Sequence, residues 1–126
     1  SVSPHLAHHP LDGRILLFDA QSRFWELTRE RWQPLDTINS PIGRFDGGLV
    51  ADGRRGELVL LGGVQDDNFI DDSWYWNGLG WVQDNVQVGL GQRRLHGMAY
   101  DRSQGHIIVF GGYTEQGITA GTMLRR

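Results

Sequence analysis

The chain has no cysteine among its 126 residues. Disulfides, cysteine metal ligands and a cysteine nucleophile are therefore excluded within these residues. No apolar run approaches the roughly 18 residues that indicate a membrane-spanning helix, so no membrane span is predicted. Basic residues are not in excess either: 12 Lys and Arg face 15 Asp and Glu, for a net charge of −3. A general binder of nucleic acid or anionic membranes would need a basic patch, so neither partner is expected.

Convincing helical patterns are also lacking. The nearest candidate is the segment 24–32, but it aligns with residues 73–81, and the alignment favours strands in both. Glycine, by contrast, is abundant: 18 glycines are spread along the chain, which suits many tight turns better than helices. The composition therefore predicts an all-β fold.

An internal repeat is the most informative feature that is present. The glycine doublets Gly62-Gly63 and Gly111-Gly112 lie 49 residues apart, each at the end of an apolar run. The same spacing separates several residues upstream, in the pairs Arg44 and Arg93, Gly48 and Gly97, Asp52 and Asp101, and Gly56 and Gly105. Repeats of this length indicate a stacked or circular array, in which one unit cannot bury its core alone.

A degraded copy precedes these two units. The apolar run Ile15–Phe18 aligns with Leu58-Val59-Leu60-Leu61 at an offset of 43, and Asp19-Ala20 takes the place of the glycine doublet. Beyond this point the offset returns to 49, because Trp25 matches Trp74 and Trp32 matches Trp81. The first unit should therefore have a loop six residues shorter. Its turn should follow a different backbone path, since glycine gives easy access to positive φ.

Each unit reads as four short strands. In the second unit we expect strands over residues 47–51, 57–61, 73–76 and 81–83, with a polar loop over 65–72 between the middle two. Four consecutive apolar residues in the strand 57–61 predict burial on both of its faces.

The units resemble the Kelch repeat, whose pattern is an Arg, a Gly-rich first strand ending in Asp, an apolar run, a glycine doublet and a later aromatic strand. The third unit carries the front of this pattern as Arg94-Leu95-His96-Gly97-Met98-Ala99-Tyr100-Asp101, and the second carries the back as Asp71-Asp72-Ser73-Trp74-Tyr75-Trp76-Asn77-Gly78. The version is similar to repeats of bacterial extracellular and galactose-oxidase-like proteins. The resemblance implies a β-propeller of four-stranded antiparallel blades, with the first strands lining a central channel and aromatic residues filling the wedges between blades. It also implies an extracellular or cell-surface bacterial setting.

The predicted organisation is a partial Kelch-like propeller of about two and a half blades: a degenerate blade over residues 1–43, a blade over 44–92 and a partial blade over 93–126. Propellers usually have about four to eight blades. We therefore expect further blades as partners, supplied either by a longer form of the same chain or by other chains that complete the ring.

The candidate ligand-binding residues fall on the loop rim that the resemblance implies. Arg44, Arg93 and Arg94 precede first strands, and guanidinium groups suit acidic ligands; the alternative is that they hydrogen-bond carbonyls or Asp between blades. In the polar loop, Asp66, Asp67, Asn68 and Phe69 would contact a ligand, and the alternative is a solvated loop. The loop is rich in oxygen ligands but lacks EF-hand spacing, and Asp71 and Asp72 are expected to be structural.

Other candidates are weaker. His5, His8 and His9 could suggest a metal site, but His5 and His8 would point to opposite faces of a strand, so no metal and no cofactor is predicted. His96 is read as structural. The aromatic residues Trp74, Trp76 and Trp81 could stack on sugars, but their blade positions favour core packing.

The predicted function is a non-enzymatic binding or scaffolding module that recognises a protein or glycan on its loop rim. No catalytic triad or carboxylate pair is present, and a copper-radical site of the oxidase kind would need a cysteine. Two alternatives stay open. One is a part of a carbohydrate-active Kelch-type enzyme whose site lies on other blades, and the other is an assembly module that completes a propeller with other chains.

Overall fold

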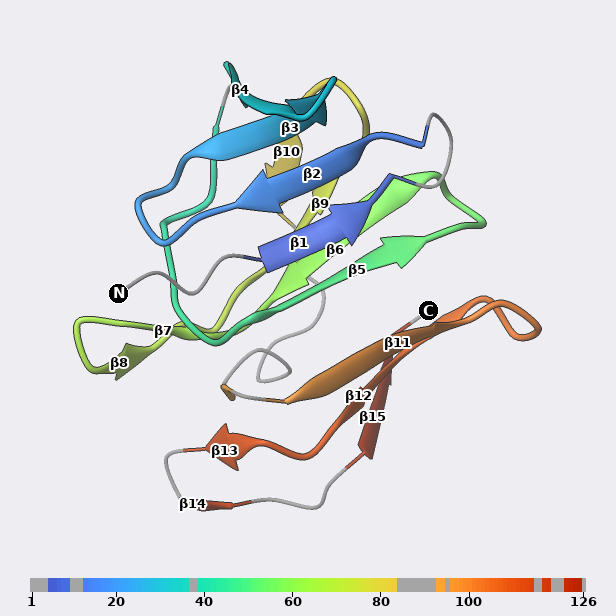
Figure 1. Ribbon diagram of the computed structural model, residues 1–126. Coiled ribbons are helices and arrows are strands. Elements are labelled where there is room, and N and C mark those ends of the chain that lie inside the picture. The colour runs from blue at the N-terminus through green and yellow to red at the C-terminus, as the bar shows by residue number, and fades with distance from the viewer. Residues whose placement is uncertain are drawn as a thin grey trace.

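The computed structural model describes residues 5–9, 13–36, 39–83, 93–94, 96–114, 117–118 and 122–125, and all regular elements among them are β-strands. The first sheet is a four-stranded antiparallel meander (Figure 1). Its strands are β1 (His5–His8), β2 (Ile15–Phe18), β3 (Phe24–Thr28) and β4 (Arg31–Leu35).

The second sheet has the same antiparallel arrangement, with the strand order β10-β9-β6-β5. Its strands are β5 (Gly48–Asp52), β6 (Glu57–Leu61), β9 (Ser73–Trp76) and β10 (Trp81–Gln83). A small hairpin, β7 (Val64–Gln65) and β8 (Asn68–Phe69), leaves the sheet between β6 and β9.

The third sheet repeats this plan as far as it is described. It contains β11 (Gly97–Asp101), β12 (His106–Phe110) and β15 (Thr122–Arg125) in the order β11-β12-β15. A second small hairpin, β13 (Tyr113–Thr114) and β14 (Gly117–Ile118), lies between β12 and β15. The all-β prediction is confirmed, and so is the prediction of four-stranded antiparallel sheets.

The three sheets are arranged like successive blades of a partial propeller. The first strands lie side by side, because β5 contacts both β1 and β11 (Figure 1). Each of these inner strands is an edge strand of its own sheet, and the later strands extend outward from them. The turns that join β5 to β6 and β11 to β12 lie at one end of the stack, and the two small hairpins lie at the other.

Strand β6 joins the three sheets because both of its faces are buried. Leu58 and Leu60 pack against the first sheet, whereas Val59 and Leu61 pack against Ile107 and Val109 of the third. All four β6 side chains are at most 1% exposed. This confirms the burial predicted from four consecutive apolar residues, since alternate residues of a strand face opposite sides.

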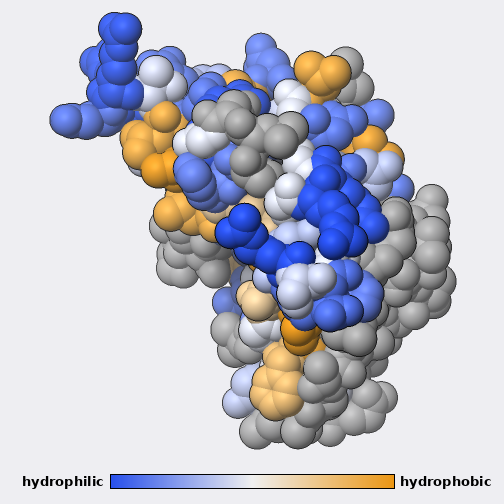
Figure 2. Space-filling model, turned by 90° about the vertical axis from the view of Figure 1, so that its right-hand side faces the viewer, coloured by the Kyte–Doolittle hydropathy of each residue, from blue (hydrophilic) through white to orange (hydrophobic). Residues whose placement is uncertain are grey.

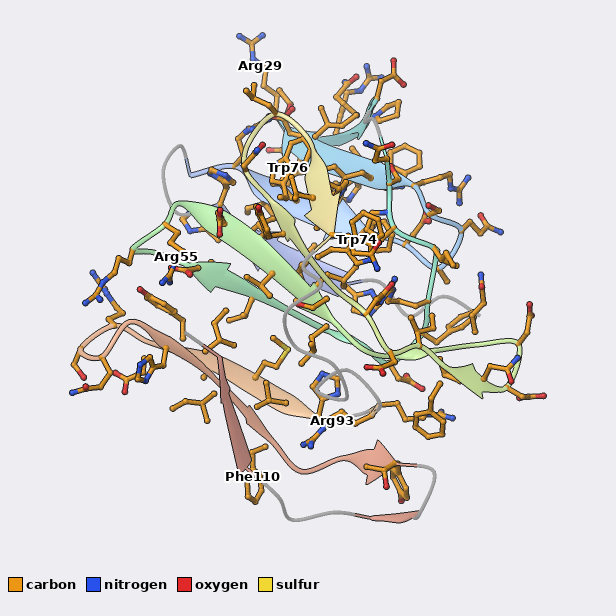
Figure 3. The ribbon with its side chains drawn as sticks, turned by 180° about the vertical axis from the view of Figure 1, so that it is seen from behind. Arg29, Arg55, Trp74, Trp76, Arg93 and Phe110 are labelled. Atoms are coloured by element: carbon orange, nitrogen blue, oxygen red, sulfur yellow. The ribbon has the colours of Figure 1, made fainter. Side chains whose placement is uncertain are left out.

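Aromatic side chains fill the space between the first two sheets. Phe24 packs edge-on against Trp76 with ring centroids 4.8 Å apart, and Phe18 meets Trp81 in the same manner at 5.7 Å. Trp74 and Trp76 are seen between these sheets in Figure 3. Edge-to-face pairs contribute about 0.5–1.5 kcal/mol beyond burial of their area. The core role predicted for the tryptophans is confirmed for Trp76 and Trp81, which are buried, while Trp74 is half-buried.

The first unit departs from the others at its turn, as the sequence predicts. Gly62 and Gly63 adopt φ values of 71° and 108°, whereas in the corresponding turn of the first unit, residues 19–22, the positive φ is at Ser22, 65°. The Asp19 carboxylate accepts hydrogen bonds from Arg23 Nε at 2.8 Å and from Trp25 Nε1 at 3.1 Å. Burial alone would raise the pKa of Asp19, but its hydrogen bonds hold that pKa below its usual range.

One sequence expectation is wrong in detail. The segment 65–72, predicted as a polar loop, contains the end of β7 and the whole of β8. Two residues, Asp66 and Asp67, form the turn between the paired strands. Apolar and polar residues alternate on both sides of Asp66-Asp67, in Val64-Gln65 and Asn68-Phe69, and this pattern is the local signal for the hairpin.

The two end faces of the stack carry exposed apolar side chains. By strand register, Leu6 and Trp32 lie on the face of the first sheet that points away from the second, where they are 56% and 41% exposed. Phe110 of the third sheet, labelled in Figure 3, is 54% exposed. These faces therefore lack the packing that β6 receives on both sides.

We expect Leu60→Ala to lower the free energy of unfolding by about 2–5 kcal/mol, because it leaves a cavity between the first two sheets. Urea unfolding followed by tryptophan fluorescence measures the change. The control is Leu79→Ala, because Leu79 is 90% exposed and such a surface change stays within about 0.5 kcal/mol. Equal effects of the two substitutions would contradict the sandwiched position of β6.

Candidate functional site

The loop rim lies at the end of the stack that carries the small hairpins (Figure 1). We define it as residues 43–47, 62–70 and 93–94. The segment entering β5 pairs with the segment after the first glycine doublet, because Phe45 and Val64 exchange two backbone hydrogen bonds of 2.9 Å. Arg94 and Tyr113 repeat the same exchange one unit later, also at 2.9 Å. The expected proximity of these connections is therefore confirmed.

Arg44 is the most buried charged residue of the rim. Its side chain is fully buried, and its guanidinium forms an ion pair with the Asp72 carboxylate. Arg44 Nη1 also donates to the Gly62 carbonyl oxygen at 3.0 Å, and Nε donates to the Ile42 carbonyl oxygen at 3.1 Å. Asp72 accepts a further bond from Trp74 Nε1 at 2.7 Å. The guanidinium therefore ties the connection to the end of β6 and the start of β9.

Arg93 occupies the equivalent position of the third unit. It is 7% exposed, and its Nη1 donates to the Gly111 carbonyl oxygen at 3.0 Å, as Arg44 does to Gly62. The position that corresponds to Asp72 is Gly121, which lies outside the described residues. The shared hydrogen bond shows that a buried guanidinium on the glycine doublet is a repeated structural device.

Arg94 differs from these two because its side chain is 37% exposed. Its Nη2 donates to Asp46 Oδ2 at 2.6 Å, which links the third unit to the connection entering the second. The backbone adds a parallel link, since Gly63 N donates to the Arg93 carbonyl oxygen at 2.9 Å. Sequence reasoning missed Asp46, and no local pattern signals a partner 48 residues away.

The remaining predicted residues form the tip of the β7–β8 hairpin. Asp66, Asp67 and Asn68 are exposed, and Phe69 is half-buried. Asp66 and Asp67 have φ values of 51° and 64°, which is the geometry of a two-residue hairpin turn. Asn68 Nδ2 donates to the Asp66 carbonyl oxygen at 3.1 Å. The structure thus brings Asp66, Asp67, Asn68 and Phe69 together on one projecting element and leaves Arg44 and Arg93 inside the protein.

The histidines are divided among different surroundings. His5 is buried, and its Nε2 accepts the Gly47 N–H at 3.0 Å while its Nδ1 faces the Phe18 carbonyl oxygen at 3.3 Å. His8, by contrast, is exposed on the same strand. Within the part of the chain that the structure describes, no three His, Asp or Glu side chains are placed to hold a metal ion, and no helix could cross a membrane.

No protein-family model matches this chain, and no curated protein is similar to it in sequence.

Removing the partner of Arg44 should destabilise the fold strongly. We expect Asp72→Ala to lower the free energy of unfolding by about 3–5 kcal/mol, because it leaves a buried guanidinium without its counter-charge. The neighbouring Asp71→Ala removes an exposed carboxylate and should stay within about 0.5 kcal/mol. Urea unfolding of the two variants measures the difference. A mild effect of Asp72→Ala would mean that water or another group neutralises Arg44.

Two histidines, the buried His5 and the half-buried His96, make stability depend on pH. Burial lowers the pKa of His96 to about 4 from its ordinary 6.5, and the positive charge of Arg93 acts in the same direction. Burial also lowers the pKa of His5. Between pH 6.5 and about 4, His96 binds a proton in the unfolded chain but not in the folded chain. The free energy of unfolding therefore falls as the pH drops from 6.5 towards 4.

We therefore expect His96→Gln to flatten this pH dependence. Urea unfolding at several pH values between 7 and about 4 measures the slope. His8→Gln, which replaces an exposed histidine, serves as the control. A slope unchanged by His96→Gln would show that His96 titrates alike in the folded and unfolded chain.

Proposed function

We propose that this chain is a segment of a Kelch-type propeller that acts as a non-enzymatic binding module, with a protein or glycan as its ligand. The ligand contacts the tip of the β7–β8 hairpin and reaches Arg94 on the same loop rim. The repeated glycine doublets and the buried arginines that support them favour this family. The rest of the rim is built from residues that the fold needs, and the hairpin projects from it (Figure 1).

The observation that carries the proposal is the backbone of the hairpin turn. Asp66 and Asp67 both hold positive φ, a conformation that costs a residue other than glycine on the order of 1 kcal/mol or more. Asn-Gly or Asp-Gly fits such a turn at lower cost. The tip therefore keeps a second carboxylate where glycine would be more stable, and strain of this kind is concentrated at functional sites.

The carboxylates at the tip are not used by the fold. Asp66 and Asp67 are exposed, and neither side chain forms a hydrogen bond or ion pair with the part of the chain that the structure describes. Carboxylates accept strong hydrogen bonds from charged donors and from hydroxyls. The complementary ligand surface is rich in donors: lysine or arginine side chains in a protein, or hydroxyl groups in a glycan. Phe69, half-buried beside the tip, offers an aromatic surface to the same ligand.

The ligand class can be identified with a glycan array and a displayed random-peptide library, both probed with the whole chain. Binders from either source support the proposal and decide between glycan and protein. No reproducible binder from either source would contradict it.

The decisive variant is Asp67→Gly. Glycine relieves the positive φ, so the free energy of unfolding should stay the same or rise by up to about 1 kcal/mol. Affinity for the selected binder should fall at least about tenfold, because a hydrogen bond to a charged group is lost. Surface plasmon resonance and urea unfolding measure the two quantities.

Asp36→Gly is the matched control, since Asp36 is exposed after β4 and away from the hairpin. It should leave the affinity unchanged. Unchanged affinity in Asp67→Gly would exclude the hairpin tip as the binding surface.

A further inference from the structure

The inner strands border an open groove at the end of the stack opposite the loop rim. Side chains of β1, β5 and β11 and of the turns that follow β5 and β11 line a volume of about 770 Å³. This volume lies within the range of roughly 300–1,000 Å³ typical of small-molecule sites. Figure 2 faces this end of the molecule and shows strongly hydrophilic side chains gathered across the middle of the face, with apolar surface beside them.

Apolar side chains from β1 and β5 line part of the groove. Leu6 and Ala7 come from β1, and Leu49 and Val50 come from β5. Because β1 and β5 are edge strands, part of their backbone N–H and C=O groups are left unpaired within the sheets. The apolar part of a ligand can therefore be buried in the groove, where a few backbone groups are available for hydrogen bonds.

Positive charge lines the turn side of the groove. Arg54 and Arg102 both line it and are exposed. Neither guanidinium forms an ion pair or hydrogen bond with the residues that the structure describes. Their neighbour Arg55, labelled in Figure 3, is instead bound to Asp52 Oδ2 at 2.9 Å.

The nearby carboxylates are occupied by their own turns. Asp52 is fully buried and accepts the backbone N–H groups of Arg54 and Arg55, each at 3.0 Å. Asp101 accepts from Ser103 N at 3.0 Å and from Ser103 Oγ at 2.7 Å. Burial alone would raise the pKa of Asp52, but the hydrogen bonds from the Arg55 backbone and side chain, together with the charge of Arg55, lower that pKa below its usual range. The two acids are therefore engaged locally, and Arg54 and Arg102 remain available to an anion.

The repeat does not require these two arginines. The turns share Asp52 with Asp101 and Gly56 with Gly105, but Arg54 corresponds to Ser103 and Arg102 corresponds to Gly53. Each turn closes through the same backbone bond, from Gly56 N to the Asp52 carbonyl oxygen at 2.9 Å and from Gly105 N to the Asp101 carbonyl oxygen at 2.8 Å. The arginines thus add charge to positions that the turn itself leaves open.

Tyr100 fixes the position of the two turns relative to each other. Its hydroxyl on β11 accepts the Arg54 N–H at 3.1 Å, so the third unit is hydrogen-bonded to the turn of the second. The ring also lines the groove beside Arg54 and Arg102. A ligand would therefore meet a wall that is already held in place, which lowers the entropic cost of binding.

We propose that this groove binds a small organic carboxylate with an apolar body. The carboxylate is held by Arg54 and Arg102, whose guanidinium groups match its geometry, and the apolar body lies along β1 and β5. The site is separate from the hairpin tip of the proposed function, and neither depends on the other.

The probe is phenylbutyrate, titrated into the isotopically labelled whole chain and followed by amide chemical shifts. The uncharged alcohol phenylbutanol, with the same apolar body, is the matched ligand. We expect phenylbutyrate to shift the amides of Val50, Ala51 and Gly53, and to bind at least about tenfold more tightly than the alcohol. Added salt should weaken the binding, because the groove is open to solvent.

Arg54→Gln and Arg102→Gln should each weaken phenylbutyrate binding about tenfold or more. Arg31→Gln, an exposed arginine of β4, should not change it, and neither should Asp67→Gly at the hairpin tip. If Arg54→Gln disturbs the turn, Arg102→Gln still tests the site. Binding that is absent at millimolar probe, equal for acid and alcohol, mapped to other amides or unchanged in both variants would overturn the proposal.

Discussion

The whole structure depends on one strand that is packed from both sides. β6 places Leu58 and Leu60 among the aromatic rings of the first interface, and Val59 and Leu61 among the aliphatic side chains of the second. Neither neighbouring sheet could bury its apolar face without this strand, which is the general condition of repeat architectures. The positions of the inner strands follow from it, because β5 precedes β6 in the same sheet and is carried between β1 and β11. Both surfaces considered for ligands are thus built around the same central sheet.

Arginine–aspartate pairs support the turns that precede the third strand in the first two units. In the second unit an arginine from the entering connection meets an aspartate before β9, and a tryptophan donates to the same carboxylate. In the first unit the pair is built from other positions: Asp19 stands at the place of Gly62, and Arg23 stands at the place of Asp72. Trp25 still donates to the carboxylate, as Trp74 does. An arginine–aspartate pair with a tryptophan donor therefore stands before the third strand in both units, although the glycine doublet is lost in the first. The pair of the second unit is the costlier one to break from one side, because Arg44 is fully buried whereas the Arg23 side chain is 56% exposed.

The sequence predicts what depends on neighbouring residues and misses what depends on distant ones. The strands Glu57–Leu61, Ser73–Trp76 and Trp81–Gln83 were predictable to the residue, because apolar runs and aromatic pairs bounded by turn residues are local signals. The sequence could not predict that Arg44 and Arg93 are buried while Arg94 is partly exposed. Arg93 and Arg94 are consecutive, and only the fold determines which of them is buried. The ion pair of Arg94 with Asp46 and the groove beneath Arg54 and Arg102 join residues from different units. Their assembly follows from the side-by-side inner strands, which no short window of sequence contains.

Comparison of the repeated units distinguishes residues whose interactions recur, and which stabilise the fold, from residues that are available to bind a ligand. At the loop rim the fold uses Arg44, Arg93 and the carbonyl groups of the glycine doublets, and the same bond recurs in both units. At the opposite end it uses an aspartate and a glycine in each turn. Among the charged residues outside this pattern are Asp66 and Asp67 at one end and Arg54 and Arg102 at the other. Each is exposed, and none has a side-chain partner among the described residues. The two ends are therefore opposite in the charge that the fold leaves unused, acidic on the projecting hairpin and basic at the groove. Ligands of opposite charge would be drawn to different ends of the same stack, since exposed charges act over about one Debye length, roughly 10 Å, at ordinary ionic strength.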